Sequence, residues 1–182
     1  MSLRQLLDIL ADGQFHSGEA LGAQLGVSRS AVWKQLKKLQ DVGIDHYSVK
    51  GRGYKIPGGL ELLCSERLAG HLSAELAAKL VSIDLQLTTA STNALAMSGV
   101  AAGRSQGNLY LAERQTAGRG RRGRAWVSPF ARNLYFSLTW TFTEGAAALE
   151  GLSLAVGLAI SQGLESFGIS GCQLKWPNDL LF

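Results

Sequence analysis

The residues best suited to chemistry form a loop rich in arginine and glycine. Residues 114–124 read RQTAGRGRRGR and contain five arginines and three glycines. Glycine lets the backbone approach a ligand closely, and each guanidinium offers a fork of donors to phosphate or carboxylate. Five cations this close repel one another, so we expect the loop to become ordered only around an anion. By itself the segment is as typical of a nucleic-acid-binding arm as of a loop that closes over a nucleotide.

Two further segments carry groups that could complete a site around that loop. Trp126 follows it and could stack on a base, although core packing is the default for a single tryptophan. The segment Lys175-Trp176-Pro177-Asn178-Asp179 places an ammonium group and two potential metal or sugar ligands after an expected strand. A plain turn explains this segment equally well, because Pro, Asn and Asp all favour turns.

The elements that must position these groups begin with a helical region. Apolar residues recur at helical spacing from Leu3 to Leu10, and Ser17 and Ser28 are suited to cap two further helices, the last over 29–42. The second and third helices, joined by a short turn, predict a helix-turn-helix. The outer face of the third helix is polar and basic. The residues expected to reach base edges or phosphates in the major groove are Ser28, Arg29, Ser30, Lys34 and Gln35.

A basic hairpin is expected directly after the third helix. Strands over 44–49 and 54–56 would flank a glycine-rich tip, where Lys50 and Arg52 would neutralise backbone phosphates. Three helices and such a hairpin make a winged helix, which typically binds DNA as a pair on two half-sites. A winged helix with a solvated basic face that binds only proteins is the alternative. Pro57-Gly58-Gly59 indicates a boundary near residue 60, so we expect domains over 1–60 and 65–182.

The second part of the chain predicts an α+β fold. Its patterns indicate helices and strands that do not alternate regularly, so we expect a mixed, mostly antiparallel sheet. The helices are expected over 65–80, 91–100 and 149–167, and the strands over 83–87, 109–113, 133–142 and 172–175.

Composition and length bear on whether the protein is disordered, membrane-bound, secreted or disulfide-rich. With 182 residues, 46% of them hydrophobic and 18% charged, the chain is not intrinsically disordered. The longest apolar run, Leu152 to Ile160, is shorter than a membrane helix needs, and no signal peptide is evident, so we expect a cytoplasmic protein without a membrane partner. The two cysteines and three histidines show no disulfide framework or metal-ligand spacing. Because the chain stops directly after the apolar run at Asp179–Phe182, we expect that its second domain is incomplete.

At this point the motifs resemble those of a known family. Ser91-Thr92-Asn93, GRGRRGR at 118–124 followed by Trp126, and KWPND at 175–179 resemble the biotin–protein ligases. The winged helix in front is similar to that of the bifunctional members, which also repress the biotin operon. The resemblance implies a catalytic fold like that of class II aminoacyl-tRNA synthetases. It also implies a reaction in which biotin and ATP, with Mg²⁺, give biotinyl-5′-AMP and pyrophosphate.

The resemblance further implies partners. The biotinyl group passes to a lysine of the biotin carboxyl carrier protein of acetyl-CoA carboxylase. Biotinyl-5′-AMP then acts as corepressor, so that a homodimer forms and binds operator DNA. Two alternatives remain. One is a ligand-sensing winged-helix regulator without ligase chemistry, and the other is a lipoate-type acyl ligase, whose reaction also passes through an adenylate.

The resemblance assigns a role to each motif position. The positions that match biotin contacts are Ser91, Thr92, Asn93, Gln115, Gly118, Arg119, Gly120 and Arg121. The positions that match the nucleotide side are Arg121, Arg124, Trp126, Lys175, Asn178 and Asp179, with Asn178 and Asp179 also on the Mg²⁺ side. Arg119, Arg121 and Lys175 would act in catalysis by neutralising the charge of the two reacting anions.

Overall fold

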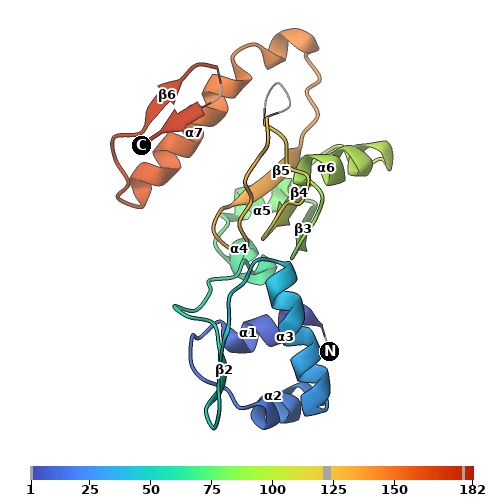
Figure 1. Cartoon of the computed structure of the whole chain (residues 1–182). Helices are drawn as coiled ribbons and strands as arrows, with labels where there is room; N and C mark the ends of the chain where they lie inside the picture. The colour runs from blue at the N-terminus through green and yellow to red at the C-terminus, as the bar shows by residue number, and fades with distance from the viewer. Residues whose placement is uncertain (1, 121–123, 178) are drawn as a thin grey trace. The chain divides into compact units, whose positions relative to one another are not determined.

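The structure is a computed structural model that describes residues 2–120, 124–177 and 179–182. The chain divides into two compact units, Met1–Trp140 and Thr141–Phe182. The first unit contains the helical N-terminal region and a three-stranded sheet, and the second contains a long helix and a hairpin (Figure 1).

The N-terminal region forms the three predicted helices, α1 (Leu3–Leu10), α2 (Gly18–Leu25) and α3 (Arg29–Asp41). Ser17 and Ser28 cap α2 and α3 as expected, because each hydroxyl oxygen accepts a hydrogen bond from the backbone N–H three residues later. The predicted helix-turn-helix is therefore confirmed.

A hairpin follows α3, built from β1 (Tyr47–Val49) and β2 (Gly53–Lys55) in antiparallel register. Residues 47–55 are called the wing below. The strands are shorter than the sequence predicts. Tyr54 extends the pairing to the α1–α2 loop, because it exchanges two backbone hydrogen bonds of 2.8 and 2.9 Å with His16. The wing is thus joined by backbone hydrogen bonds to the loop that precedes α2.

The best-packed core lies around these helices. Residues from α1, α2 and α3 form a buried hydrophobic cluster that also includes Leu62 and Phe130 from beyond the expected boundary. The cluster consists of Leu6, Leu7, Leu10, Leu21, Val32, Leu36, Leu39, Ile44, Ile56, Leu62 and Phe130. The first compact unit therefore extends past residue 60, and the boundary placed there stays a prediction.

Two short helices follow, α4 (Ser65–Gly70) and α5 (Ala74–Lys79), where the sequence predicts one continuous helix over 65–80. That prediction is wrong because Ser73 starts a new helix. Its hydroxyl oxygen accepts a hydrogen bond of 3.3 Å from the backbone N–H of Leu76.

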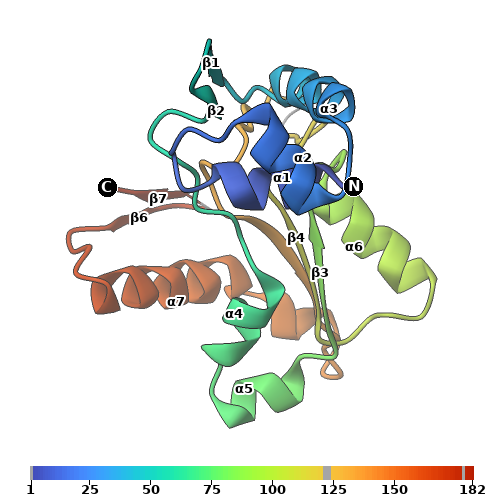
Figure 2. The same ribbon diagram turned by 90° about the horizontal axis from the view of Figure 1, so that it is seen from below.

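The sheet of the first unit has the order β3 (Ser82–Gln86), β4 (Asn108–Ala112) and β5 (Tyr135–Thr139). Strands β3 and β4 are parallel and are joined through α6 (Thr92–Ala101), whereas β4 and β5 are antiparallel. The expected mixed α+β arrangement is confirmed. Helix α6 lies on one face of this sheet, and α4 and α5 lie on the other (Figure 2).

The second unit comprises the 3-10 helix η2 (Ala146–Leu149), α7 (Leu152–Ser166) and a hairpin of β6 (Gln173–Lys175) and β7 (Asp179–Leu181). The stretch Ala146–Ser166 is long and apolar enough, by length and composition alone, to cross a membrane. The stretch contains no long unbroken apolar run, because glycine and small polar residues interrupt it. A core helix of a soluble protein passes the same test, so the expected absence of a membrane partner stays a prediction.

Candidate functional site

The N-terminus of α6 meets the side chain of Gln115, which lies just beyond β4. Gln115 Oε1 accepts hydrogen bonds from the backbone N–H of Thr92 at 2.8 Å and from its hydroxyl at 3.3 Å. Ser91 is the N-cap residue but makes no capping hydrogen bond with its side chain. Gln115 therefore supplies, from the segment that follows β4, the acceptor that a cap residue usually provides.

A third group completes this cluster. Ser137, on β5, donates a hydrogen bond of 3.0 Å from its hydroxyl to Thr92 Oγ1, and Thr92 is buried. The sequence motifs do not include Ser137, because nothing local marks a serine on a strand as a partner. The sequence places Ser137 in an expected strand, but only the pairing of that strand with β4 brings it to Thr92. Asn93, the next motif residue, lies exposed on the first turn of α6.

Backbone pairing brings the two motif segments together. Thr89 N–H donates to the carbonyl of Arg114 at 3.1 Å, and Thr116 N–H donates to the carbonyl of Thr89 at 2.9 Å. These bonds continue the parallel pairing of β3 and β4 beyond the strand ends. They fix the start of α6 beside the start of the arginine-glycine loop.

In the described part of that loop, the residues before 121 pair with the residues after 123. Gly120 N–H donates to the carbonyl of Arg124 at 2.9 Å, and Arg119 is paired with Ala125. A Cβ atom added at Gly118 would lie 3.1 Å from Trp126 Cδ1 and 3.2 Å from Gln115 Nε2.

Trp126 is more than half exposed, so it does not pack in a core. Of the predicted loop residues, Arg121 lies outside the described residues. The prediction that the loop becomes ordered around an anion stays a prediction.

Lys175 and Asp179 face each other as register partners of the β6–β7 hairpin in the second unit. Both line a cavity of about 360 Å³ between the hairpin and α7, whose other lining residues are mainly apolar. Asn178 lies outside the described residues. Among the residues that the structure describes, no group of three or more His, Cys, Asp and Glu side chains could hold a metal ion.

The two residues before Gln115 contact the N-terminal region. Glu113 is buried, and its carboxylate accepts a hydrogen bond of 2.6 Å from the backbone N–H of Leu63. Burial raises the pKa of Glu113 above its ordinary value, although the bond from Leu63 works in the opposite direction. Arg114 donates from Nη1 to the carbonyl of Asp41, the last residue of α3, at 2.9 Å.

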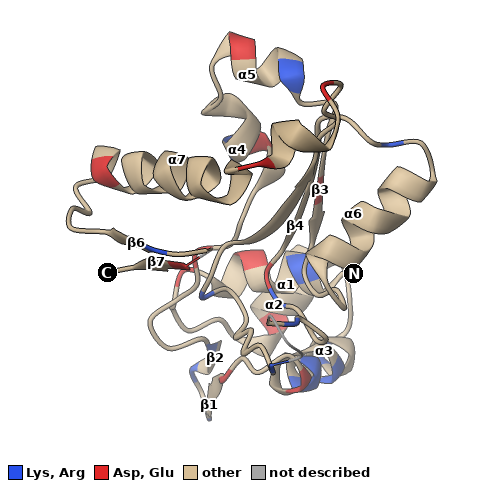
Figure 3. Cartoon of the chain, turned by 90° about the horizontal axis from the view of Figure 1, so that it is seen from above, with Lys and Arg blue, Asp and Glu red and all other residues tan. Residues whose placement is uncertain are grey.

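The predicted DNA-binding residues gather on α3 and the wing, where Figure 3 shows lysine and arginine in blue. Arg29 and Lys50 line a hollow of about 270 Å³ between α2, α3 and the wing. The guanidinium of Arg52 lies 4.2 Å from the ring centre of Phe15, a contact that the sequence did not indicate.

The hydroxyl groups of Ser28 and Ser30 lie 2.9 Å apart at the start of α3. Lys34 is exposed and Gln35 is partly buried.

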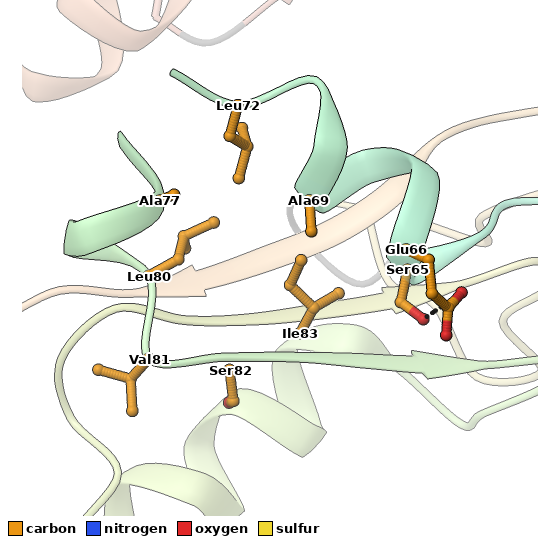
Figure 4. Close-up of a pocket in the computed structure, with 9 residues that line it drawn as sticks. All are labelled: Ser65, Glu66, Ala69, Leu72, Ala77, Leu80, Val81, Ser82 and Ile83. Carbon is orange, nitrogen blue, oxygen red and sulfur yellow. Dashed lines mark hydrogen bonds between the residues drawn. The ribbon is translucent and has the colours of Figure 1, made fainter. Parts of the chain in front are cut away.

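An apolar pocket lies away from the predicted site residues. It has a volume of about 360 Å³ between α4, α5 and β3. Figure 4 shows apolar side chains such as Leu72, Leu80 and Ile83 around this space, with Ser65 and Glu66 at one end. Its lining offers little polar chemistry.

Fold and site together define a winged helix joined to an α+β domain in which a polar cluster adjoins an arginine-glycine loop. Residues 88–182 match the biotin/lipoate A/B protein ligase family, and residues 2–55 match a helix-turn-helix domain. The chain belongs to the biotin/lipoate A/B protein ligase family.

Several curated relatives are named bifunctional ligase/repressor BirA, among them those of Salmonella typhimurium and Escherichia coli. That of Salmonella typhimurium is 44% identical over 96% of this chain and 52% of its own length. That of Escherichia coli is 43% identical over 97% of this chain and 53% of its own length. The chain thus spans about half the length of these curated relatives. The biotin protein ligase of Leishmania major, solved with biotin, matches at 28% identity with a TM-score of 0.49 over 56% of this chain and 46% of its own.

Proposed function

We propose that the protein is an ATP-dependent biotin–protein ligase that also represses transcription through its winged helix. The observation that carries this proposal is the cluster of Thr92, Gln115 and Ser137 directly beside the arginine-glycine loop. The names of the two relatives, which describe a ligase that is also a repressor, support the same pair of functions.

The proposed chemistry has two steps. A carboxylate oxygen of biotin attacks the α-phosphorus of ATP, the bond to the β-phosphate oxygen breaks, and biotinyl-5′-AMP and pyrophosphate result. The amine of an acceptor lysine then attacks the biotinyl carbonyl carbon, so that an amide forms, AMP leaves and the amine loses a proton. The substrate itself supplies the nucleophile, so the protein must orient two anions, neutralise their charge and exclude water.

The α6 end of the site suits the biotin ring system, whose ureido group carries both hydrogen-bond donors and an acceptor. Thr92 and Gln115 are hydrogen-bonded to each other, so their polar atoms are oriented before a ligand binds. Asn93 is exposed on the same turn and can reach a ligand. Ser91, whose hydroxyl makes no capping bond, completes the biotin contacts in this proposal.

The arginine-glycine loop suits the carboxylate and the phosphates. Arg119 and Arg121 would neutralise the reacting anions, and the glycines at 118 and 120 would let the backbone close over them. Arg124 and Trp126 would contact the nucleotide, with the exposed indole against the adenine.

The phosphates of ATP would be contacted by Lys175, Asn178 and Asp179. The register pairing of Lys175 with Asp179 supports this role, because it places a cation and a carboxylate at one end of the hairpin. Mg²⁺ would enter on the ATP phosphates, with one or two protein oxygens, as is usual for this ion.

The repressor function would rest on two winged helices binding paired half-sites. In this proposal biotinyl-5′-AMP is the corepressor that favours the homodimer, and the biotin carboxyl carrier protein of acetyl-CoA carboxylase competes for it as acceptor. The exposed basic residues of α3 and the wing support DNA as the partner. A cytoplasmic location follows from these partners.

Pyrophosphate release by the purified protein tests the ligase proposal. With ATP and Mg²⁺ present, release should require biotin and should stay at background with lipoate. Release with lipoate alone would identify a lipoate-type ligase. Biotin binding without release under any condition would favour a ligand-sensing regulator that carries out no chemistry.

A further inference from the structure

Trp33 carries a large aromatic side chain on the outer face of α3, and the residue is 48% exposed. The neighbouring residues Val32, Leu36 and Leu39 point into the core, so the exposure of Trp33 is set by the helix and not by loose packing. Burying an indole would gain free energy, so an aromatic side chain left at this position favours a surface that meets a partner.

The surroundings of Trp33 are cationic. The ammonium group of Lys37 lies 3.9 Å from the centre of the indole ring, and Lys34 is exposed beside it on the same helix. Residues four positions apart share a helix face, so this face combines the aromatic ring of Trp33 with the ammonium group of Lys37. Such a face is complementary to a polyanion that also offers apolar groups, which describes the major groove of DNA.

Arg29 and Ser28, two of the predicted DNA-binding residues, make contacts within the protein. A Cβ atom added at Gly18 would lie 3.2 Å from Arg29 Cγ, so the Arg29 side chain packs against α2. Arg29 lines the hollow beside the wing together with Lys50 and Glu19, a position suited to a backbone phosphate. The Ser28 hydroxyl caps the helix and contacts Ser30. Trp33 and Lys34 are both exposed on α3 and are available for contacts with base edges.

We propose that Trp33 is a specificity-determining residue that reads the 5-methyl group of a thymine in the major groove, with Lys37 holding the indole in place. This proposal rests on the proposed DNA-binding function. Apolar side chains distinguish thymine from the other bases through this methyl group, and an indole offers a flat apolar surface of suitable size. Lys37 carries its charge over the ring, where it can also approach a phosphate.

The experiment begins with selection of the preferred site of the wild-type protein from a random DNA library. Each thymine of that site is then replaced by uracil, which lacks only the methyl group, and affinities are measured in the presence of biotin and ATP. One thymine in each half-site should be sensitive, and its replacement should weaken binding about three- to fivefold, as expected for one methyl group leaving an apolar contact. The Trp33→Ala variant should bind thymine and uracil sites equally, whereas Trp33→Phe should keep part of the discrimination.

Lys50→Ala is the matched control for a phosphate contact. It should weaken binding to all sequences alike and reduce the dependence on salt, while the thymine–uracil discrimination persists. If no thymine in the wild-type site is sensitive to uracil, or if Trp33→Ala discriminates as the wild type does, the role of Trp33 is overturned. If the wild type selects no sequence at all, the proposed DNA-binding function fails instead. The uracil series on the wild-type protein needs no variant, so the test holds even if Trp33→Ala does not fold.

Discussion

Gln115 accepts two hydrogen bonds from Thr92 and lies against Gly118 at the start of the arginine-glycine loop. In Gln115→Ala the buried donors of Thr92 lose their acceptor, which costs about 1–3 kcal/mol. We expect biotin affinity, measured by titration calorimetry, to fall at least tenfold. Gln24→Ala, at an exposed position of α2, is the control and should leave the affinity unchanged. Unaltered binding in Gln115→Ala would contradict a biotin-contacting role.

Glu113 provides a prediction about pH. Its pKa is raised by burial, so the folded protein binds this proton more tightly than the unfolded chain does. The contribution of Glu113 to stability is therefore complete below the ordinary glutamate pKa, about 4.3, and is lost as the pH rises through the raised pKa. Glu113→Gln removes this titration but keeps an acceptor for Leu63.

The free energy of unfolding of Glu113→Gln should therefore improve relative to the wild type as the pH rises from about 4 toward neutrality. Denaturant unfolding of both proteins across this range measures the difference. Parallel curves would show that burial does not control this carboxyl group.

At the scale of single residues, the motifs include Thr92 and Gln115, which the structure brings together, but not Ser137, Trp33 or Phe15, and the biotin-contacting role of Thr92 and Gln115 stays a prediction. The first two belong to motifs that are recognisable by residue type and spacing. Ser137 contacts Thr92 only because β5 pairs with β4 in one register, and a one-residue shift would turn it to the other face. Phe15 meets Arg52 only because the wing folds back on the α1–α2 loop.

At the scale of elements, the wing depends on Gly53. Its φ of +103° is unfavourable for other residues, and an added Cβ would collide with the backbone of His16. We expect Gly53→Ala to lower the melting temperature and to weaken DNA binding, because β2 could no longer pair with His16. The cost should exceed about 2 kcal/mol.

Gly51→Ala is the matched control, since Gly51 also has a positive φ but has open space around it. It should cost only about 1 kcal/mol, the strain of the backbone conformation alone. Equal effects of the two substitutions would show that the contact with His16 does not matter.

Elements with strong local signals were the most predictable. Serine caps and apolar spacing gave α1, α2 and α3 almost to the residue, because these signals act within one turn. The continuous helix expected over 65–80 was wrong because apolar spacing outweighed the capping signal of Ser73. Strand β7 was not predicted as an element because a three-residue strand exists only through its pairing with β6.

At the scale of the molecule, three consecutive residues join different parts of the first unit. Glu113 is hydrogen-bonded to the backbone of Leu63, Arg114 to the last residue of α3, and Gln115 to the first residue of α6. Phe130 adds an apolar contact with the helical core. The candidate ligand site and the N-terminal helical region are thus connected through the segment that follows β4, which is compatible with one protein carrying out both proposed functions.

The measurement that tests the central claim most directly is operator-type DNA binding by the purified protein with and without its ligands. Affinity for the selected site should rise when biotin and ATP are supplied together, and it should not rise with either alone, because only the pair can form biotinyl-5′-AMP. DNA affinity that is the same under all four conditions would contradict the account of a ligase whose product controls its winged helix.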